Sequence, residues 1–155
     1  MKILFYRWGA YTEKDIVEEL SAKGVTVNEI IYPVKDKHHD DNLETMLGNM
    51  IDKGSFDAVL SINYFPVVAS VCNTRNIKYI SWTYDAPLNV TNIEDTLGFE
   101  TNYVFMFDRL QTDGYINAGF NNVYHLPLAV STKRYDRIVL TEAFLIICKW
   151  RSICV

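Results

Sequence analysis

The run FDAVLSI, residues 56–62, has the composition of a strand that is buried on both faces. A helix-like stretch from about Asn42 to Lys53 precedes it, and Pro66 opens a second helix-like stretch after it. The run KYISWTY, residues 78–84, then returns to β-branched and aromatic residues. Apolar strands separated by helices predict parallel neighbours in one sheet, because a parallel pair needs a crossover connection.

The same rhythm extends towards both ends of the chain. The stretch 12–24 has apolar residues at helical spacing, with Thr12 as its predicted N-cap and Gly24 as its end. The stretch 91–99 is ambiguous, and a helix that ends at Gly119 precedes the last strand. The predicted strands are 2–6, 25–32, 56–62, 78–84, 102–107 and 122–126. We therefore expect an α/β domain with a doubly wound, mostly parallel, Rossmann-like sheet and helices on both faces.

The composition fits one globular domain with a core of its own, since 49% of the 155 residues are hydrophobic. The net charge is −4 and there is no basic stripe, so nucleic acid is not an expected partner. The apolar start, Ile3 to Tyr6, is interrupted by Arg7 and is too short for a signal peptide or a membrane span. We expect a cytoplasmic protein with no membrane span.

Neither the cysteines nor the histidines predict a metal site. The cysteines are odd in number and form no CxxC pair, which also argues against a disulfide framework. They are Cys72, Cys148 and Cys154. His38 and His39 stand beside two aspartates in a polar stretch, but adjacent histidines project in different directions. We expect buried or incidental thiols and no bound metal.

The strand ends carry the residues that could form a ligand site. In a parallel sheet every strand delivers its following loop to the same edge. At this edge the sequence places RWGAY (7–11), NYFP (63–66), TYDAP (83–87), FDR (107–109) and HLPLA (125–129). Aromatic faces beside polar groups suit a sugar or a nucleotide base. The sequence therefore predicts a small-molecule crevice along this edge.

Several residues at this edge have a structural interpretation beside the functional one. Asp85 can face a ligand, or it can hold a turn ahead of Pro87 through an Asx hydrogen bond. Asp108 can cap the helix that follows it, or act as a catalytic acid. His125 can be a satisfied core histidine or a general base.

The familiar nucleotide-binding motifs are missing from the sequence. A lone Gly9 follows the first strand instead of GxGxxG, and GxxxxGK[ST] does not occur. A phospho-receiver would need acids after the first strand, where Arg7 and Trp8 stand. A flavodoxin-like carrier would need a Ser/Thr-rich phosphate loop there, which the sequence also lacks.

Taken together, the strand-end motifs SINYFP, YISWTYDAP, FMFDR and YHLPLA resemble the N-terminal domain of bacterial GT-B glycosyltransferases related to the CgeB-type spore-maturation proteins. The resemblance runs from about Phe56 to Val130. It implies two Rossmann-like domains, of which the N-terminal one holds the acceptor and the C-terminal one holds the nucleotide-sugar. Sugar transfer would occur in the cleft between them.

The resemblance also implies roles for individual residues. Asp85 would be the catalytic residue, taking the proton of the acceptor hydroxyl if transfer inverts the anomeric centre and only positioning the acceptor if it retains it. The implied substrate-binding residues are Asn63, Tyr64, Pro87, Asp108 and Arg109, to which the strand-end position adds Arg7 and Trp8. From the residues alone, Asn63 and Tyr64 can equally be structural. The expected partner is a sugar or glycan acceptor, and no cofactor is expected in this chain because the donor would bind the C-terminal domain.

The chain departs from the family pattern after the LPLA motif, where a second domain would follow and this sequence continues for about 25 residues. We divide it into a domain at 1–132 and a tail at 133–155. The apolar tail is either a helix that docks on the sheet or a truncated or frame-shifted end in place of the donor domain. On the second interpretation we expect the isolated chain to be inactive and its exposed interface to favour self-association.

An alternative from another class is a non-catalytic, Rossmann-like ligand-binding or protein-interaction domain. Such a domain would keep the polar cleft at the strand ends without transferring a sugar.

Overall fold

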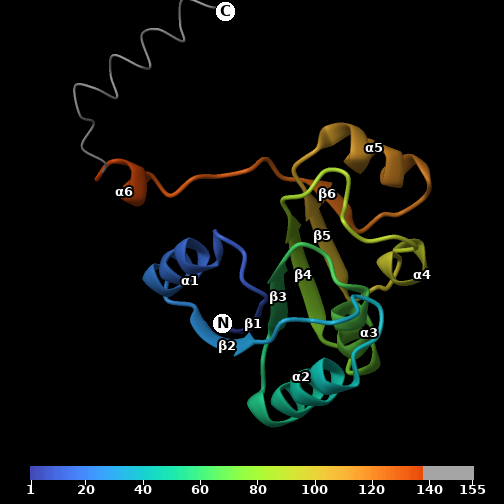
Figure 1. Cartoon of the computed structure of the whole chain (residues 1–155), viewed down its shortest axis with the longest axis horizontal. Coiled ribbons are helices and arrows are strands. Elements are labelled where there is room, and N and C mark those ends of the chain that lie inside the picture. Colours follow the sequence, from blue (N-terminus) through green and yellow to red (C-terminus); the bar gives the residue numbers. More distant parts are fainter. Residues whose placement is uncertain (138–155) are drawn as a thin grey trace, which may run out of the picture.

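A computed structural model describes residues 1–137, and its six strands form one sheet (Figure 1). The elements in chain order are β1 (Lys2–Arg7), α1 (Glu13–Ala22), β2 (Thr26–Ile31), α2 (Asp41–Gly54), β3 (Ala58–Ile62), α3 (Pro66–Thr74), β4 (Lys78–Thr83), α4 (Glu94–Leu97), β5 (Asn102–Met106), α5 (Arg109–Asn117), β6 (Val123–His125) and α6 (Thr132–Tyr135). Most of the predicted tail, 133–155, lies outside the described residues, as do Cys148 and Cys154.

The strand order is β2-β1-β3-β4-β5-β6, and every neighbouring pair is parallel. β1 lies between β2 and β3, with Ile3 opposite Val27 on one side and Ala58 on the other. The chain therefore winds from β1 towards β2 in one direction and towards β3 to β6 in the other. The predicted doubly wound α/β fold is confirmed.

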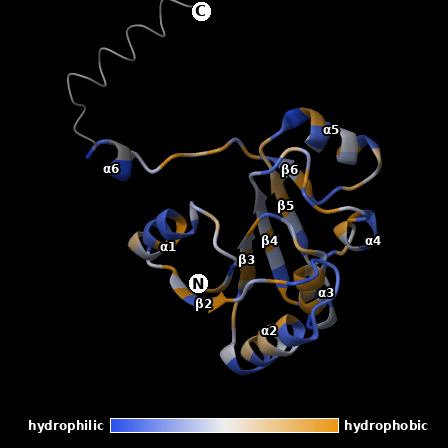
Figure 2. Cartoon of the chain, viewed as in Figure 1, coloured by the Kyte–Doolittle hydropathy of each residue, from blue (hydrophilic) through white to orange (hydrophobic). Residues whose placement is uncertain are grey.

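The two faces of the sheet are covered unequally. α1 lies alone beside one face, while α2, α3, α4 and α5 lie on the other (Figure 1). The core under α1 is small and centres on Ile3, Phe5, Leu60 and Ile62. The opposite core joins residues from all six strands with residues from α2, α3 and α4, and Tyr115 of α5 packs against it. In Figure 2, α3 is largely hydrophobic and α1 largely hydrophilic, as expected for a helix wedged between neighbours and one that faces solvent.

α2 forms where a cap and an apolar stripe agree. The Asp40 carboxylate accepts a hydrogen bond from the backbone N–H of Leu43 at 3.1 Å, which satisfies a free donor of the first turn. Leu43, Leu47 and Ile51 recur at helical spacing and are buried against the sheet. The helix extends the predicted stretch by one residue at each end.

The start of α1 differs from the prediction. Thr12 occupies the N-cap position, but its side chain makes no capping hydrogen bond. The first turn is instead held by Glu13, whose carboxylate accepts from the backbone N–H groups of Trp8 and Gly9 at 2.9 and 3.1 Å. A carboxylate one residue further along thus replaces the threonine hydroxyl.

β1 is one residue longer than predicted, and the other five strands, β2 to β6, are shorter. Before β3, Asp57 leaves the regular ladder to accept a hydrogen bond from the backbone N–H of Lys2 at 2.6 Å through its carboxylate. The ambiguous stretch 91–99 contains the single turn of α4.

Tyr79 of β4 fastens the end of β3 to its neighbour from inside the core. Its hydroxyl lies 2.7 Å from Ser61 Oγ and accepts from the backbone N–H of Phe65 at 3.1 Å. Ser61 Oγ in turn donates to the carbonyl of Asn63 at 2.7 Å. The hydroxyl is fully buried, and this burial raises the pKa of Tyr79 well above its ordinary value. This small network fixes the path of residues 61–65, which lead from the end of β3 to the start of α3.

We expect Tyr79→Phe to lower the free energy of unfolding by about 1–3 kcal/mol, because it leaves the buried Phe65 N–H without its acceptor. Urea unfolding followed by circular dichroism measures the change. Tyr11→Phe is the matched control, since Tyr11 is 97% exposed and should change stability by less than about 0.5 kcal/mol. Equal effects of the two variants would contradict the role given to the hydroxyl.

Candidate functional site

A crevice of about 260 Å³ opens at the carboxyl ends of β1, β3 and β4. It lies where the strand order reverses, between β1 and β3, which is the position that ligands favour in open α/β sheets. Its lining includes Trp8, Lys37, Asn63, Phe65, Asp85 and Asn89. Three of the predicted site residues, Trp8, Asn63 and Asp85, therefore lie together here, although they are far apart in the sequence.

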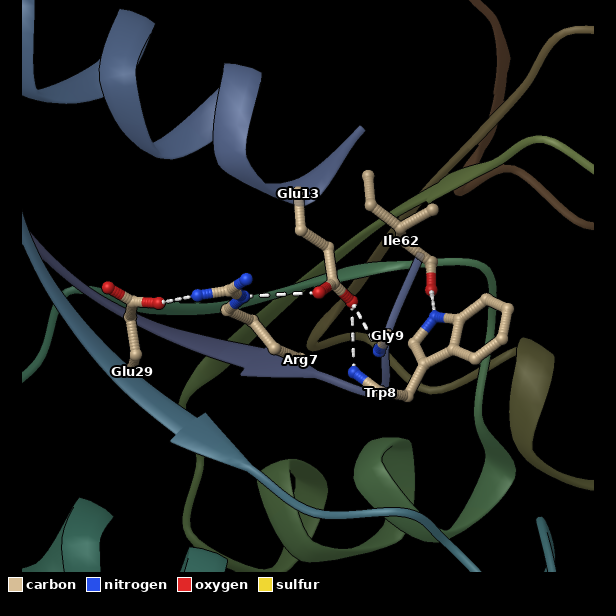
Figure 3. A network of polar contacts seen from close by, with 6 residues as sticks. All are labelled: Arg7, Trp8, Gly9, Glu13, Glu29 and Ile62. Carbon is tan, nitrogen blue, oxygen red and sulfur yellow. Dashed lines mark hydrogen bonds and ion pairs between the residues drawn. The ribbon is translucent and has the colours of Figure 1, made fainter. Parts of the chain in front are cut away.

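Trp8 is held in place at both its backbone and its ring (Figure 3). The Glu13 carboxylate accepts from its backbone N–H, and its indole Nε1 donates to the carbonyl of Ile62 at 2.7 Å. The ring packs edge-on against Phe65, with the centroids 6.1 Å apart. Trp8 is still 39% exposed, so part of this fixed aromatic surface is open to a ligand.

Arg7 is part of the same network but serves a different purpose (Figure 3). Its guanidinium forms an ion pair with Glu13 through Nε at 3.1 Å and a second one with Glu29 of β2. The hydrogen bond to Glu29 raises the pKa of Arg7 above its ordinary value. The predicted substrate-binding residue Arg7 thus lies outside the lining of the crevice and neutralises Glu13, whose side chain is only 2% exposed.

Asn63 joins the ends of β3 and β4. Its backbone is left-handed, with φ of 64°, a conformation that asparagine tolerates better than most residues. Its side-chain oxygen accepts from the backbone N–H of Tyr84 at 2.8 Å, and its amide nitrogen donates to Asp85 Oδ2 at 2.8 Å. The amide therefore orients the Asp85 carboxylate, which is half-buried at the rim.

Two irregular stretches close the crevice on either side. Lys37 donates from Nζ to the carbonyl of Asn89, and its own carbonyl accepts from the backbone N–H of Val67 at 2.9 Å. The Ala86–Pro87 peptide bond is cis, and Pro87 is exposed in the same loop as Asp85 without lining the crevice.

Tyr64 lies in the core and not in the crevice. It is 1% exposed, its hydroxyl donates to Thr96 Oγ1 at 2.9 Å, and it accepts from Asn102 Nδ2 at 3.2 Å. The left-handed turn at Asn63 directs the following side chain inward, where desolvation raises the pKa of Tyr64. The structure thus places Tyr64 out of reach of a ligand at the rim.

Asp108 and Arg109 form a second polar group on the same edge, at the ends of β5 and β6. Asp108 caps α5 by accepting from the backbone N–H of Gln111 at 2.7 Å. Arg109 Nη2 lies 3.2 Å from His125 Nδ1, and His125 Nε2 lies 3.1 Å from the carbonyl of Phe107. A neutral ring protonated on Nε2 satisfies both contacts. These residues do not line the crevice at Asn63 and Asp85.

Three lining residues, Lys37, Phe65 and Asn89, were not among the predicted site residues. Phe65 stands in the NYFP motif, so its position at a strand end was the available signal. Lys37 and Asn89 come from irregular stretches, in which no periodicity predicts what a side chain faces.

Within residues 1–137, no three histidine, cysteine, aspartate or glutamate side chains are grouped so that they could hold a metal ion. No helix in this part of the chain is both long and apolar enough to cross a bilayer.

The Asn63 backbone and side chain can be separated by two substitutions. We expect Asn63→Ala to lower the free energy of unfolding by about 2–3 kcal/mol, since it loses the hydrogen bonds to Asp85 and Tyr84 and strains the left-handed backbone. Asn63→Gly loses the same bonds but tolerates the backbone, so it should be about 1 kcal/mol less destabilised. Chemical denaturation of both variants tests this order. An alanine variant as stable as the glycine variant would show that the backbone is not strained.

Asp40 should give the protein a stability that depends on acid pH. The hydrogen bond from the backbone N–H of Lys35 lowers the pKa of Asp40 below its ordinary value of 3.8. The resulting stabilisation is present above that value and is lost as the pH falls through the lower, folded-state value. The stability difference between the protein and Asp40→Asn should therefore be constant above about pH 5 and shrink below pH 4. A stability difference that does not change with pH would contradict this expectation. The control is Asp113→Asn, because Asp113 is exposed on α5.

Comparisons with known proteins add little to the geometry. No protein-family model matches the chain, and no curated protein matches it. Among solved structures, it is similar to the receiver domain of the sensor histidine kinase PA1611 from Pseudomonas aeruginosa PAO1, with a TM-score of 0.44 and 14% sequence identity over 88% of this chain and 91% of that one. The likeness, at this level, carries no conclusion about a ligand or a reaction.

Proposed function

We propose that this domain binds a sugar or glycan acceptor in the crevice at Asn63 and Asp85, as the acceptor-side half of a GT-B glycosyltransferase. One observation carries the proposal. The fixed ring of Trp8 and the oriented carboxylate of Asp85 line the same crevice, at the point where the strand order of the parallel sheet reverses. The resemblance of the strand-end motifs to the CgeB-type family supplies the reaction class.

The lining of the crevice matches the chemistry of a sugar ring. A pyranose offers a C–H face that packs on an aromatic ring, and hydroxyl groups that need donors and acceptors around its edge. Trp8 supplies the aromatic surface, and the buried ring of Phe65 packs against it from the core. The same opening is lined by polar groups of three kinds: the carboxylate of Asp85, the ammonium group of Lys37 and the amide of Asn89. A volume of about 260 Å³ suits one sugar unit, with the rest of a glycan outside.

The carboxylate of Asp85 is prepared for contact with a hydroxyl. The Asn63 amide donates a hydrogen bond to Oδ2 and so fixes the plane of the carboxylate. Oδ1 can then accept a hydrogen bond from a hydroxyl group of the sugar. In an inverting transfer Asp85 takes the hydroxyl proton as the new bond forms, and in a retaining transfer it only positions the acceptor. Asn63 then acts through Asp85 and is a positioning residue.

The proposal assigns the nucleotide-sugar to a second domain, as the resemblance implies. That domain would face the strand ends, where Asp108, Arg109 and His125 form the neighbouring polar group. These three would then lie near the interface between the domains, and the crevice near the reacting hydroxyl.

Nuclear magnetic resonance titration tests acceptor binding directly. Glucose, galactose and N-acetylglucosamine, and their β-linked disaccharides, should shift the backbone amides of Trp8, Asn63 and Asp85. Asp85→Asn should weaken binding about tenfold, the loss of roughly 1.4 kcal/mol from one charge-assisted hydrogen bond. Asp113→Asn is the matched control, because it removes the same charge at an exposed position on α5. It should bind sugars as tightly as the unsubstituted protein. Shifts confined to another surface, or no shift with any of these sugars, would overturn the proposal.

An assay of transfer separates the half-enzyme from its alternatives. We expect residues 1–155 to transfer no sugar from UDP-glucose to an acceptor that binds. Transfer that Asp85→Asn abolishes would overturn the half-enzyme assignment and leave the role of Asp85 in place. The same assay should be repeated with a donor-binding GT-B domain fused to the chain. If this fusion also binds a sugar but transfers none, the result would favour the non-catalytic binding module.

A further inference from the structure

The crevice carries one positive and one negative side chain. Lys37 and Asp85 are the charged members of its lining, and both are half-buried. Within residues 1–137 neither of them forms an ion pair, and they do not pair with each other. Arg7, at the end of β1, differs in this respect, because it pairs with two carboxylates. The charges of the crevice thus lack a partner of opposite sign in the described part of the chain.

The backbone around Lys37 is held in place from two sides. The carbonyl of Lys37 accepts a hydrogen bond from the backbone N–H of Val67, in the first turn of α3, at 2.9 Å. The Asp36 carboxylate accepts from the backbone N–H of His38 at 2.8 Å, which closes a turn around Lys37. The side chain of Lys37 therefore reaches the crevice from a fixed stretch of backbone.

The ammonium group of Lys37 is only partly satisfied by the protein. It has three N–H donors, and the bond that it makes within residues 1–137 goes to the carbonyl of Asn89. This bond has a structural interpretation, since it ties the stretch before α2 to the loop after β4. A carbonyl does not neutralise the positive charge, however, and a half-buried charge is costly until it is paired. The charge itself therefore calls for an anion that the described residues do not supply.

Asp85 sets the opposite requirement in the same crevice. An ionised carboxylate only accepts hydrogen bonds, so its free Oδ1 suits a hydroxyl group and repels an anion. A neutral sugar would satisfy Asp85 and leave Lys37 without an ion pair. A sugar that carries an acidic group beside its hydroxyl groups would satisfy both residues.

We propose that the acceptor bound in this crevice is an acidic sugar. Its carboxylate or phosphate group pairs with Lys37 Nζ, while one of its hydroxyl groups donates to Asp85 Oδ1. The inference rests on the proposed function, because it names the chemical class of the acceptor at that site. Carboxylate and phosphate offer the same chemistry to a lysine, and the experiment below distinguishes them.

A matched pair of glycosides tests the acidic group. Methyl β-glucoside and methyl β-glucuronide differ at C6, where the first has a hydroxymethyl group and the second a carboxylate. In a nuclear magnetic resonance titration, we expect the glucuronide to bind about tenfold more tightly and to shift the amides of Trp8, Lys37 and Asp85. Methyl β-glucoside 6-phosphate is the third ligand. The tighter of the two acidic glycosides identifies the group as a phosphate or a carboxylate.

Substitutions of Lys37 show whether this residue reads the acidic group. Lys37→Met removes the charge and keeps an unbranched side chain, so the difference in affinity between glucuronide and glucoside should vanish. Lys37→Arg keeps the charge and should keep the preference. Lys35→Met is the matched control, because Lys35 is exposed on the same stretch and does not line the crevice. It should leave the preference unchanged.

Salt provides a readout on the unsubstituted chain. Raising the salt concentration from about 50 mM to about 500 mM should weaken binding of the glucuronide several-fold, because salt screens the attraction between two charges. Binding of the neutral glucoside should hardly change. This comparison decides the question if Lys37→Met does not fold.

The outcomes separate this inference from the proposed function. Equal affinities of glucoside and glucuronide at the crevice would overturn the acidic acceptor and leave the sugar site standing. A preference for the glucuronide that persists in Lys37→Met would also overturn the inference, since another group would then read the acid. If none of the three glycosides shifts the amides of Trp8, Asn63 and Asp85, the inference and the proposed function both fail.

Discussion

The position of β1 between β2 and β3 is the constraint on which the rest of the molecule depends. Because the chain leaves β1 in one direction to form β2 and returns on the other side to form β3, the loops at their carboxyl ends diverge. The divergence opens a crevice at the end of β1, and the parallel pairing brings the ends of β3 and β4 to the same place. Every later feature of the site is built on this opening.

A set of buried and half-buried polar groups holds the backbone around the crevice. Glu13 ties the β1–α1 turn through two backbone N–H groups, and Arg7 compensates its charge. Tyr79 fixes the end of β3 from below, and Asn63 links that end to Asp85. Buried polar groups of this kind are costly when a partner is missing, so each one enforces the geometry of its neighbours. The rigidity of the rim is a consequence of these obligatory partners.

The fold was predictable from the sequence because it depends on patterns along the chain. Apolar runs separated by helices gave the parallel sheet, and Pro66 and Asp108 marked the helix starts where they are found. The site was predictable in part, since parallel strands bring Asn63 and Asp85 together whatever the details of their loops.

The remaining details depend on contacts that no local pattern contains. Arg7 stands at a strand end as Trp8 does, but its ion pair with Glu29 comes from the neighbouring strand. Tyr64 follows a residue with left-handed backbone, which breaks the strand alternation and sends the ring inward. Lys37 reaches the crevice only because its loop folds back onto Asn89 and Val67. Side-chain direction in irregular backbone is set by tertiary contacts, and these are invisible in composition or spacing.

β4 connects the rim of the crevice with the side of the sheet on which α1 lies. Its end carries Asp85 at the rim, while Trp82, three residues earlier, lies on that side and donates from Nε1 to the carbonyl of Leu126 at 3.3 Å. Tyr84 packs edge-on against Trp82, and its backbone N–H is the donor that Asn63 accepts. The packing of Trp82 on one side of the sheet is therefore linked, through Tyr84 and the Asn63 side chain, to the orientation of the Asp85 carboxylate at the edge.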